Sequence, residues 1–321
     1  MRFLQIILVL STLVLGGCAS IGERLALPGL VQGHPEAVLP PNPGYQVVSL
    51  HTSDGTPIVA EFGKALDSRG QPISAAEHAP TIVFFYGRLM CLAHSVTKDL
   101  FDKFRRTGAN VIIPEFPGYG MSGGRATERE FYSTADAVYA YLLSREDIDR
   151  ERIIAAGWSM GSGTAVDLAS RKKVAGLIVV GAFTNLEDVG RPNLPWYVRW
   201  LTPALGARCK FDNLAKIHAV RCPIVLVYGS KDNLVPPEMA DRLATASTSK
   251  VTRLEVEGAQ HEDIWAVGGP VVWHAIENWM MSLNRIRTES SKAANERMPN
   301  QAPEPTPTTV TPPAGQEARQ P

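Results

Sequence analysis

The chain has 321 residues, of which 45% are hydrophobic, so it is long enough to form one large domain with a substantial core. Its 32 lysines and arginines balance 32 aspartates and glutamates. This balance provides no overall field for nucleic acid, and we expect no nucleic-acid partner. No group of cysteines and histidines has the spacing of a zinc site, so the sequence predicts no metal and no cofactor.

A targeting segment occupies residues 1–17. Arg2 supplies a positive charge, and the apolar run Phe3–Leu15 is shorter than the ~20 residues of a membrane-spanning helix, which is typical of a signal peptide. The run leads into Leu-Gly-Gly-Cys, which resembles the lipobox of bacterial lipoproteins. The resemblance implies cleavage before Cys18, lipidation of its thiol, and attachment to the membrane by several acyl chains. Ala19 then implies the bacterial cell envelope, at the outer membrane facing the periplasm. An ordinary secretory signal with an incidental cysteine is the alternative.

Residues 18–44 are rich in proline and glycine and show no periodicity, so we expect a tether between the membrane and a domain over residues 45–283. Inside that domain, continuous apolar runs such as TIVFFY at 81–86 indicate strands buried on both faces of a parallel sheet. The predicted strands are Tyr45–His51, Pro57–Phe62, Thr81–Tyr86, Val111–Pro114, Arg152–Gly157, Gly176–Val180, Cys222–Tyr228 and Val251–Val256.

Helical periodicity is found at Glu128–Ser144 and in the closing segment Val271–Leu283. Strands that alternate with helices predict an α/β fold, with a doubly wound, mainly parallel, eight-stranded sheet. Residues 182–212 lack periodicity and contain several aromatic side chains, which indicates a small lid over the site or, alternatively, a packed surface excursion. The polar, proline-rich residues 284–321 are predicted to be disordered.

The candidate nucleophile is Ser159. It lies in Gly157-Trp158-Ser159-Met160-Gly161, a G-x-S-x-G pattern with a strand before it and a run of small residues with helical character after it. In such a turn the serine hydroxyl projects from the top of the sheet, and only glycine fits the flanking positions because strand and helix approach closely. The helix that follows points its N-terminal N–H groups toward a developing oxyanion.

The candidate base and the candidate acid that would activate Ser159 follow other strands. Asp232 comes directly after a predicted buried strand and His261 after the last one, which places both at the carboxyl edge of the sheet. A serine needs a base near neutral pKa, and that base needs a carboxylate that holds its tautomer. The competing carboxylates bracket the lid or neighbour the histidine (Asp188, Asp212 and Asp263). The backbone N–H groups of Met160 and Arg88 are the candidate oxyanion donors, and the Arg88 side chain is expected to meet an anionic substrate group or to be solvated.

These segments are similar to those of the α/β-hydrolase superfamily, and within it to the BEM46-like and ABHD17-like serine hydrolases. The segments that carry the resemblance are residues 157–161, 118–123 (GYGMSG), 211–214 (FDNL), 222–232 (CPIVLVYGSKD) and 258–261 (GAQH). The resemblance implies a serine hydrolase acting on an ester, thioester or amide, with Ser159 as nucleophile, Asp232 as acid and His261 as base. Two departures are Tyr86-Gly87-Arg88, where the family has His-Gly-Asn, and Glu115-Phe116-Pro117, where it has Asp-Tyr-Arg.

Function is therefore expected to be that of a membrane-anchored serine hydrolase, carboxylesterase- or thioesterase-like, that cleaves a small-molecule or acyl substrate through an acyl-enzyme. A peptidase or amidase of the same fold is one alternative. A non-catalytic envelope lipoprotein that uses the fold for binding is another. Three cysteines remain besides Cys18, and an oxidising compartment permits one bond, for which Cys91 and Cys209 are the candidates and Cys222 is not.

Overall fold

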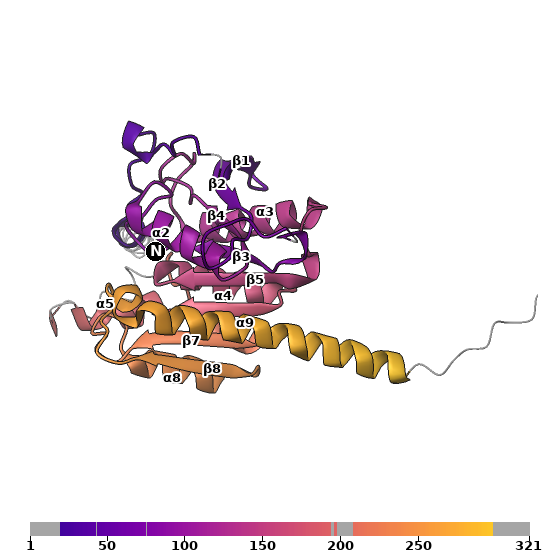
Figure 1. Ribbon diagram of the computed structural model, residues 1–321. Helices are drawn as coiled ribbons and strands as arrows, with labels where there is room; N and C mark the ends of the chain where they lie inside the picture. Colours follow the sequence, from indigo (N-terminus) through magenta and orange to yellow (C-terminus); the bar gives the residue numbers. More distant parts are fainter. Residues whose placement is uncertain (1–19, 43, 75, 194–195, 198–207, 298–321) are drawn as a thin grey trace, which may run out of the picture. The chain divides into compact units, whose positions relative to one another are not determined.

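Eight strands form one sheet in the order β1-β2-β4-β3-β5-β6-β7-β8. We describe it from a computed structural model in which residues 20–42, 44–74, 76–193, 196–197 and 208–297 are placed (Figure 1). β2 pairs antiparallel with β1 and β4, and all other pairs are parallel. The prediction of a mainly parallel, eight-stranded sheet is confirmed. The strands are β1 (Gln46–His51), β2 (Pro57–Gly63), β3 (Thr81–Phe85), β4 (Asn110–Pro114), β5 (Ile153–Trp158), β6 (Gly176–Val180), β7 (Ile224–Gly229) and β8 (Val251–Val256).

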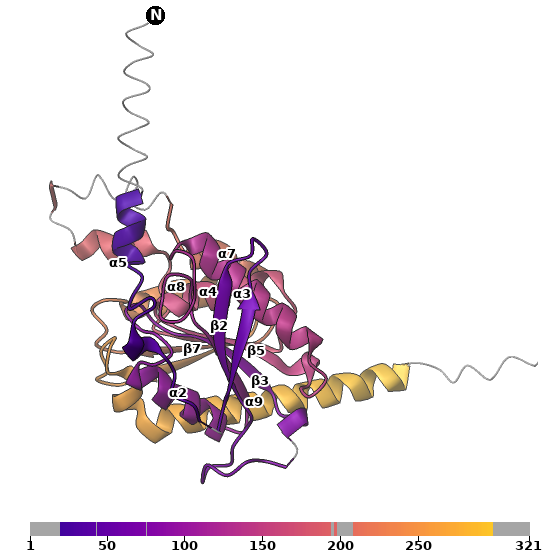
Figure 2. The ribbon, with the colours of Figure 1, turned by 90° about the horizontal axis from the view of Figure 1, so that it is seen from above.

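Helices cover both faces of the sheet. Figure 2 shows α2 and α9 on one side and α3, α4 and α8 on the other. The helices are α2 (Ser95–Arg106), α3 (Glu128–Ser144), α4 (Met160–Arg171), α5 (Leu186–Asn193), α7 (Asn213–Lys216), α8 (Pro237–Ala246) and α9 (Ile264–Arg297). The sequence predicts α3, α4 and part of α9 but neither α2 nor α8.

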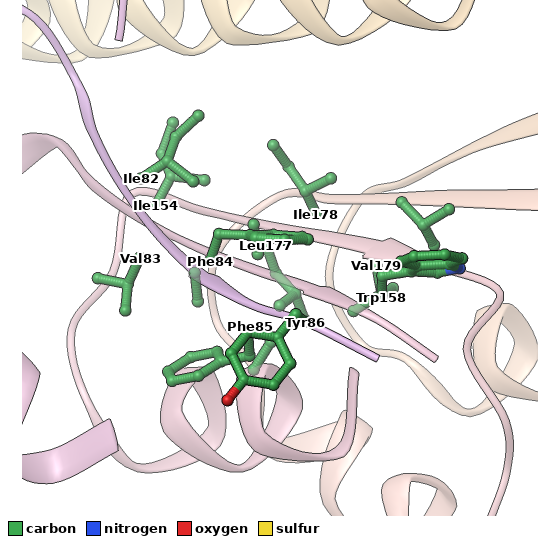
Figure 3. Packing of buried hydrophobic residues seen from close by; sticks show 14 of the residues in the cluster. Ile82, Val83, Phe84, Phe85, Tyr86, Ile154, Trp158, Leu177, Ile178 and Val179 are labelled. Carbon is green, nitrogen blue, oxygen red and sulfur yellow. The ribbon is translucent and has the colours of Figure 1, made fainter. Parts of the chain in front are cut away.

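The core is formed by strand side chains that point to both faces of the sheet and by the helix side chains that pack against them. Figure 3 shows Ile82, Ile154 and Ile178 on one face, and Val83 and Phe85 on the other. All five are buried. Because central strands are covered on both sides, their sequences are continuously apolar rather than alternating. This packing fixes the carboxyl ends of β3, β5, β6, β7 and β8, which are the positions from which the candidate site is built.

The helix α9 differs from the predicted closing helix at both ends. It begins at Ile264 and is interrupted at Gly269, whose φ of 44° and ψ of −137° lie outside the helical region, immediately before Pro270. The predicted start at Val271 therefore marks only the second part. At the other end the helix continues to Arg297, so residues 284–297 are helical where disorder is predicted. The chain divides into two compact units after Leu283, and residues 298–321 lie outside the described part.

The segment predicted to be a tether is, over its described residues, packed on the domain. Residues 20–26 form a short helix, which we call the N-terminal helix, and Leu27, Ala37 and Leu39 after it are buried. The backbone is paired as well: the N–H of Gly120 donates to the carbonyl of Leu30 at 2.9 Å. The apolar residues of this segment are too irregularly spaced to give a periodic signal, yet each buries surface against the domain. Residues 1–19, with the predicted signal and Cys18, lie outside the described part.

Candidate active site

Three side chains that are far apart in the sequence form one hydrogen-bonded chain. Ser159 Oγ lies 2.7 Å from His261 Nε2, and His261 Nδ1 lies 2.7 Å from Asp232 Oδ2. An ionised carboxylate only accepts hydrogen bonds, so Nδ1 carries the proton and Nε2 is left to accept from the serine hydroxyl. This is the arrangement in which a histidine can take a proton from a nucleophile.

Ser159 lies on a strained turn between β5 and α4, with φ of 51°. The glycines around it have no room for a side chain. A Cβ on Gly157 would lie 2.3 Å from the carbonyl oxygen of Gly161, and a Cβ on Gly161 would lie 1.9 Å from that of Phe85. The expectation that only glycine fits both positions is therefore confirmed. The turn holds the hydroxyl out at the carboxyl edge of the sheet.

Asp232 is held by the loop that follows β7. Its side chain is fully buried, and its Oδ1 accepts from the N–H groups of Leu234 at 3.0 Å and Val235 at 2.7 Å. These bonds leave Oδ2 for His261 and fix the direction of the carboxylate. Of the aspartates that compete with it in the sequence, Asp188 instead pairs with Arg242, and Asp212 caps α7 through the N–H of Ala215.

His261 is positioned by a residue that the sequence analysis does not single out. Gly181, at the end of β6, has φ of 54°, and a Cβ on it would lie 3.0 Å from Cε1 and 3.2 Å from Nδ1 of the imidazole. The absence of a side chain at residue 181 therefore makes space for the ring. A glycine that directly follows a buried strand at the carboxyl edge is the signal that points to such a position.

The candidate oxyanion donors lie on either side of Ser159. A Cβ on Gly87 would be 3.6 Å from Cβ of Ser159, which brings the turn after β3 against the nucleophile. Among the described residues, the N–H groups of Arg88 and Met160 donate to no other group. Both remain available for an oxygen that develops negative charge.

The side chain of Arg88 is exposed, in line with the expectation of solvation, and it also bonds to another part of the protein. It turns away to the N-terminal helix, where Nε donates to the carbonyl of Ala26 at 2.9 Å and Nη2 to that of Leu25 at 2.8 Å. These are carbonyls at the C-terminal end of the helix, where a cation is favourable. Arg88 thus joins the turn beside the nucleophile to the segment that follows Cys18.

The buried carboxyl of Glu115 holds the turn after β3 by hydrogen bonds. Glu115 accepts a short hydrogen bond from the Tyr86 hydroxyl, and both its oxygens accept from the N–H of Leu92, at 3.1 and 3.2 Å. Burial raises the pKa of Glu115 to about 7. The two departures from the family pattern are therefore one structural unit, because Tyr86 and Glu115 bond to each other across neighbouring strand ends.

A pocket of about 420 Å³ opens in front of Ser159 and His261, a size typical of small-ligand sites. Its walls are mostly apolar. The walls are formed by the turn after β3, the turn at Ser159, α5 and the loop after Asp232. Ala26 of the N-terminal helix also lines the pocket, which the sequence does not predict. Leu186, Val189 and Gly190 of α5, which belong to the predicted lid, line the pocket, whereas residues 194–195 and 198–207 of that segment lie outside the described part.

The three cysteines of the described residues are free and buried, so the bond considered between Cys91 and Cys209 is absent. Burial raises the pKa of each thiol, which disfavours a thiolate nucleophile. Over the same residues, no cluster of three or more histidine, cysteine or acidic side chains could hold a metal ion. None of the described helices is both long and apolar enough to cross a bilayer.

Comparison with known proteins agrees with the architecture. A family model described as the α/β hydrolase fold matches residues 80–202. The esterase Pf2001 of Pyrococcus furiosus has a TM-score of 0.59 at 17% identity, over 74% of this chain and 92% of the esterase. The sheet order and these matches show that the chain has the α/β-hydrolase fold.

Two relatives are similar in sequence. The α/β hydrolase domain-containing protein WAV2 of Arabidopsis thaliana is 28% identical over 265 residues, which make up 77% of this chain and 82% of that protein. An uncharacterised protein of Mycobacterium tuberculosis is 30% identical over 187 residues, or 58% of this chain and 65% of its own length. The printed name of WAV2 refers to the same fold as the family model.

Proposed function

We propose that the protein is a serine hydrolase that cleaves an ester or thioester through an acyl-enzyme intermediate. The observation that carries the proposal is the continuous chain from Ser159 through His261 to Asp232 at the mouth of an apolar pocket. The α/β-hydrolase fold and its esterase neighbours support hydrolase activity in general.

In the proposed mechanism, Ser159 Oγ attacks the carbonyl carbon while its proton passes to His261 Nε2. The carbonyl oxygen becomes an oxyanion, which accepts from the N–H groups of Met160 and Arg88. Collapse of this intermediate expels an alcohol or thiol, which takes the proton from His261. A water molecule then gives a proton to the same nitrogen as it attacks the acyl carbon, the bond from that carbon to Ser159 Oγ breaks, and Oγ takes the proton back as the carboxylic acid leaves. Asp232 stabilises the imidazolium in both halves without being protonated.

The shape of the pocket supports an acyl substrate. Its lining contains aliphatic side chains from several segments, such as Leu89, Leu186, Val189 and Leu234, and these suit a hydrocarbon chain next to the reacting carbonyl. We further propose that Cys18 is lipidated and anchors the protein in the bacterial cell envelope, at the outer membrane on the periplasmic side. The lipobox-like sequence that ends at Cys18 supports this part of the proposal.

Replacement of the nucleophile tests the proposed function. Ser159→Ala is expected to lower kcat for p-nitrophenyl esters by about 10⁴-fold or more, because triad residues act as a unit. Thermal unfolding should show that the fold is retained. A fluorophosphonate probe should label the native protein and leave the variant unlabelled. Equal hydrolysis by the two proteins would overturn the proposal, and a preference for peptides over esters would redirect it to amide substrates.

A further inference from the structure

A second hollow, separate from the pocket in front of Ser159, lies beside the start of the described chain. It has a volume of about 520 Å³, and residues of the N-terminal helix and of the segment before α3 line it. Four arginines and two glutamates surround it, in a chain whose overall charge is zero. The arginines are Arg24, Arg125, Arg129 and Arg208, and all four are exposed.

The guanidinium groups of two of these arginines have no partner among the described residues. Arg129 pairs with Asp54 and Glu130, and Arg208 donates to Ser20 Oγ at 2.8 Å. Arg24 and Arg125, in contrast, make no ion pair with any described residue, although both line the hollow and an adjoining groove. An exposed cluster of guanidinium groups whose charge is not neutralised by neighbouring carboxylates is suited to bind phosphate oxygens.

The same helix also presents apolar side chains to solvent. Ile21 and Leu25 lie one turn apart, and Leu89 lies at the edge of the pocket. Each of the three is at least 50% exposed. Leu25 and Leu89 are held near each other because Arg88, next to Leu89, donates to the carbonyl of Leu25. Exposed leucine and isoleucine beside arginines are typical of a surface that rests in the headgroup region of a bilayer.

The N-terminal helix connects all of these features. Ser20 lines the arginine-rich hollow and Ala26 lines the pocket, and six helical steps separate them by only about 9 Å. Cys18 precedes Ser20 by two residues, which reach at most about 7 Å. A lipid on Cys18 would therefore leave the hollow and the mouth of the pocket both close to the membrane surface.

We propose that this face docks on a bilayer that contains anionic phospholipids, with the arginines on the phosphates, and that the pocket takes its acyl substrate from that bilayer. The substrate part of this inference rests on the proposed serine hydrolase activity, whereas the docking part does not. The occupant is a lipid surface because the exposed apolar side chains of the N-terminal helix lie beside arginines from three segments, next to the predicted site of lipidation.

The test uses the full-length protein reconstituted on phosphatidylcholine vesicles with and without phosphatidylglycerol. In the double variant Arg24→Glu/Arg125→Glu, the hydrolysis of a long-chain ester dissolved in the phosphatidylglycerol vesicles should fall about tenfold or more. Hydrolysis of a soluble acetate ester should be unchanged. The control Arg69→Glu/Arg221→Glu makes the same charge change in loops that precede β3 and β7, at the opposite edge of the sheet, and should behave like the native protein.

Docking is measured independently by amide hydrogen exchange. In the native protein, phosphatidylglycerol should slow exchange over residues 20–30, and the Arg24→Glu/Arg125→Glu variant should lose this protection. Equal protection in both proteins overturns the docking surface. Protection without any hydrolysis of the acetate ester overturns the proposed function and leaves the docking surface standing. Protection with hydrolysis of the acetate but not of the bilayer ester overturns the supply of substrate from the membrane.

Discussion

Two walls of the pocket are built in different ways. The wall around Ser159 is made of strand ends whose backbones touch, so that a single added Cβ at Gly161 would lie 1.9 Å from a carbonyl oxygen. The wall at Ala26 belongs to a segment whose described residues pair with no strand. Two exposed hydrogen bonds from Arg88, scattered backbone bonds such as that from Gly120 to Leu30, and buried side chains such as Leu27 hold it on the domain. Hydrogen bonds of that kind contribute about 0.5–1.5 kcal/mol each. The proposed chemistry therefore belongs to the rigid wall, and the proposed membrane contact belongs to the wall that the N-terminal segment forms.

The largest effect is expected from a substitution in the rigid wall, at Gly181. Gly181→Ala places a Cβ against the imidazole of His261 and forces alanine into a left-handed conformation. A displacement of the base by a fraction of an ångström to one ångström is expected to lower kcat about 100-fold, with a smaller change in KM. Steady-state kinetics on a p-nitrophenyl ester measures both constants.

Gly55→Ala is the matched control, because Gly55 also has a positive φ but a Cβ there would contact nothing within 4 Å. It should lose a similar amount of stability and keep its kcat. If both alanine variants retain full kcat, the rigid wall does not position His261, and the contrast between the two walls loses its main support.

Sequence reasoning succeeds on the rigid wall for a physical reason. The strands around β5 are buried on both faces, so they are continuous apolar runs, and the turn at Ser159 can be made only with glycine on either side. Asp232 and His261 follow such strands directly. Each of these features leaves a local mark in the sequence, and the fold and the meeting of the three side chains follow from those marks.

The same reasoning fails at residues 20–44. Leu27, Ala37 and Leu39 have no common period, because the segment follows an irregular path over the domain, and its composition is that of a linker. Arg88 likewise gives no sign of its partner, since its hydrogen bonds go to main-chain carbonyls, which every residue has. Contacts of this kind depend on the three-dimensional path of the chain and leave no pattern in the sequence.

A second prediction concerns Glu115, the buried carboxyl next to the rigid wall, and its effect on the pH dependence of stability. Burial raises the pKa of Glu115 to about 7, whereas the carboxyl of an unfolded chain titrates near 4.5. Between these values the folded protein holds a proton that the unfolded chain releases. The contribution of Glu115 to stability is therefore greatest below about pH 4.5 and falls as the pH rises to about 7, by an amount on the order of 3 kcal/mol.

Glu115→Gln removes this titration and keeps the size of the side chain. The free energy of unfolding, measured with urea between pH 4.5 and pH 8, should decline less with pH in the variant than in the native protein. Glu257→Gln, at an exposed carboxyl after β8, serves as the control and should leave the slope unchanged. A slope in Glu115→Gln equal to that of the native protein would show that the carboxyl behind the turn is not a source of the pH dependence.

The smallest expected effect comes from loosening the second wall. Arg88→Met keeps the backbone N–H that we assign to the oxyanion and removes both hydrogen bonds to the N-terminal helix. Because only the Ala26 side of the pocket changes, kcat for an acetate ester should stay within about twofold, while KM for a long-chain ester should rise about three- to tenfold, the equivalent of one hydrogen bond or slightly more. Arg88→Lys can still donate to one carbonyl, so its KM for the long-chain ester should lie between those of the native protein and Arg88→Met. A fall in kcat for the acetate ester would instead place the guanidinium at the reacting atoms, and the two walls would then no longer divide the proposed chemistry from the proposed membrane contact.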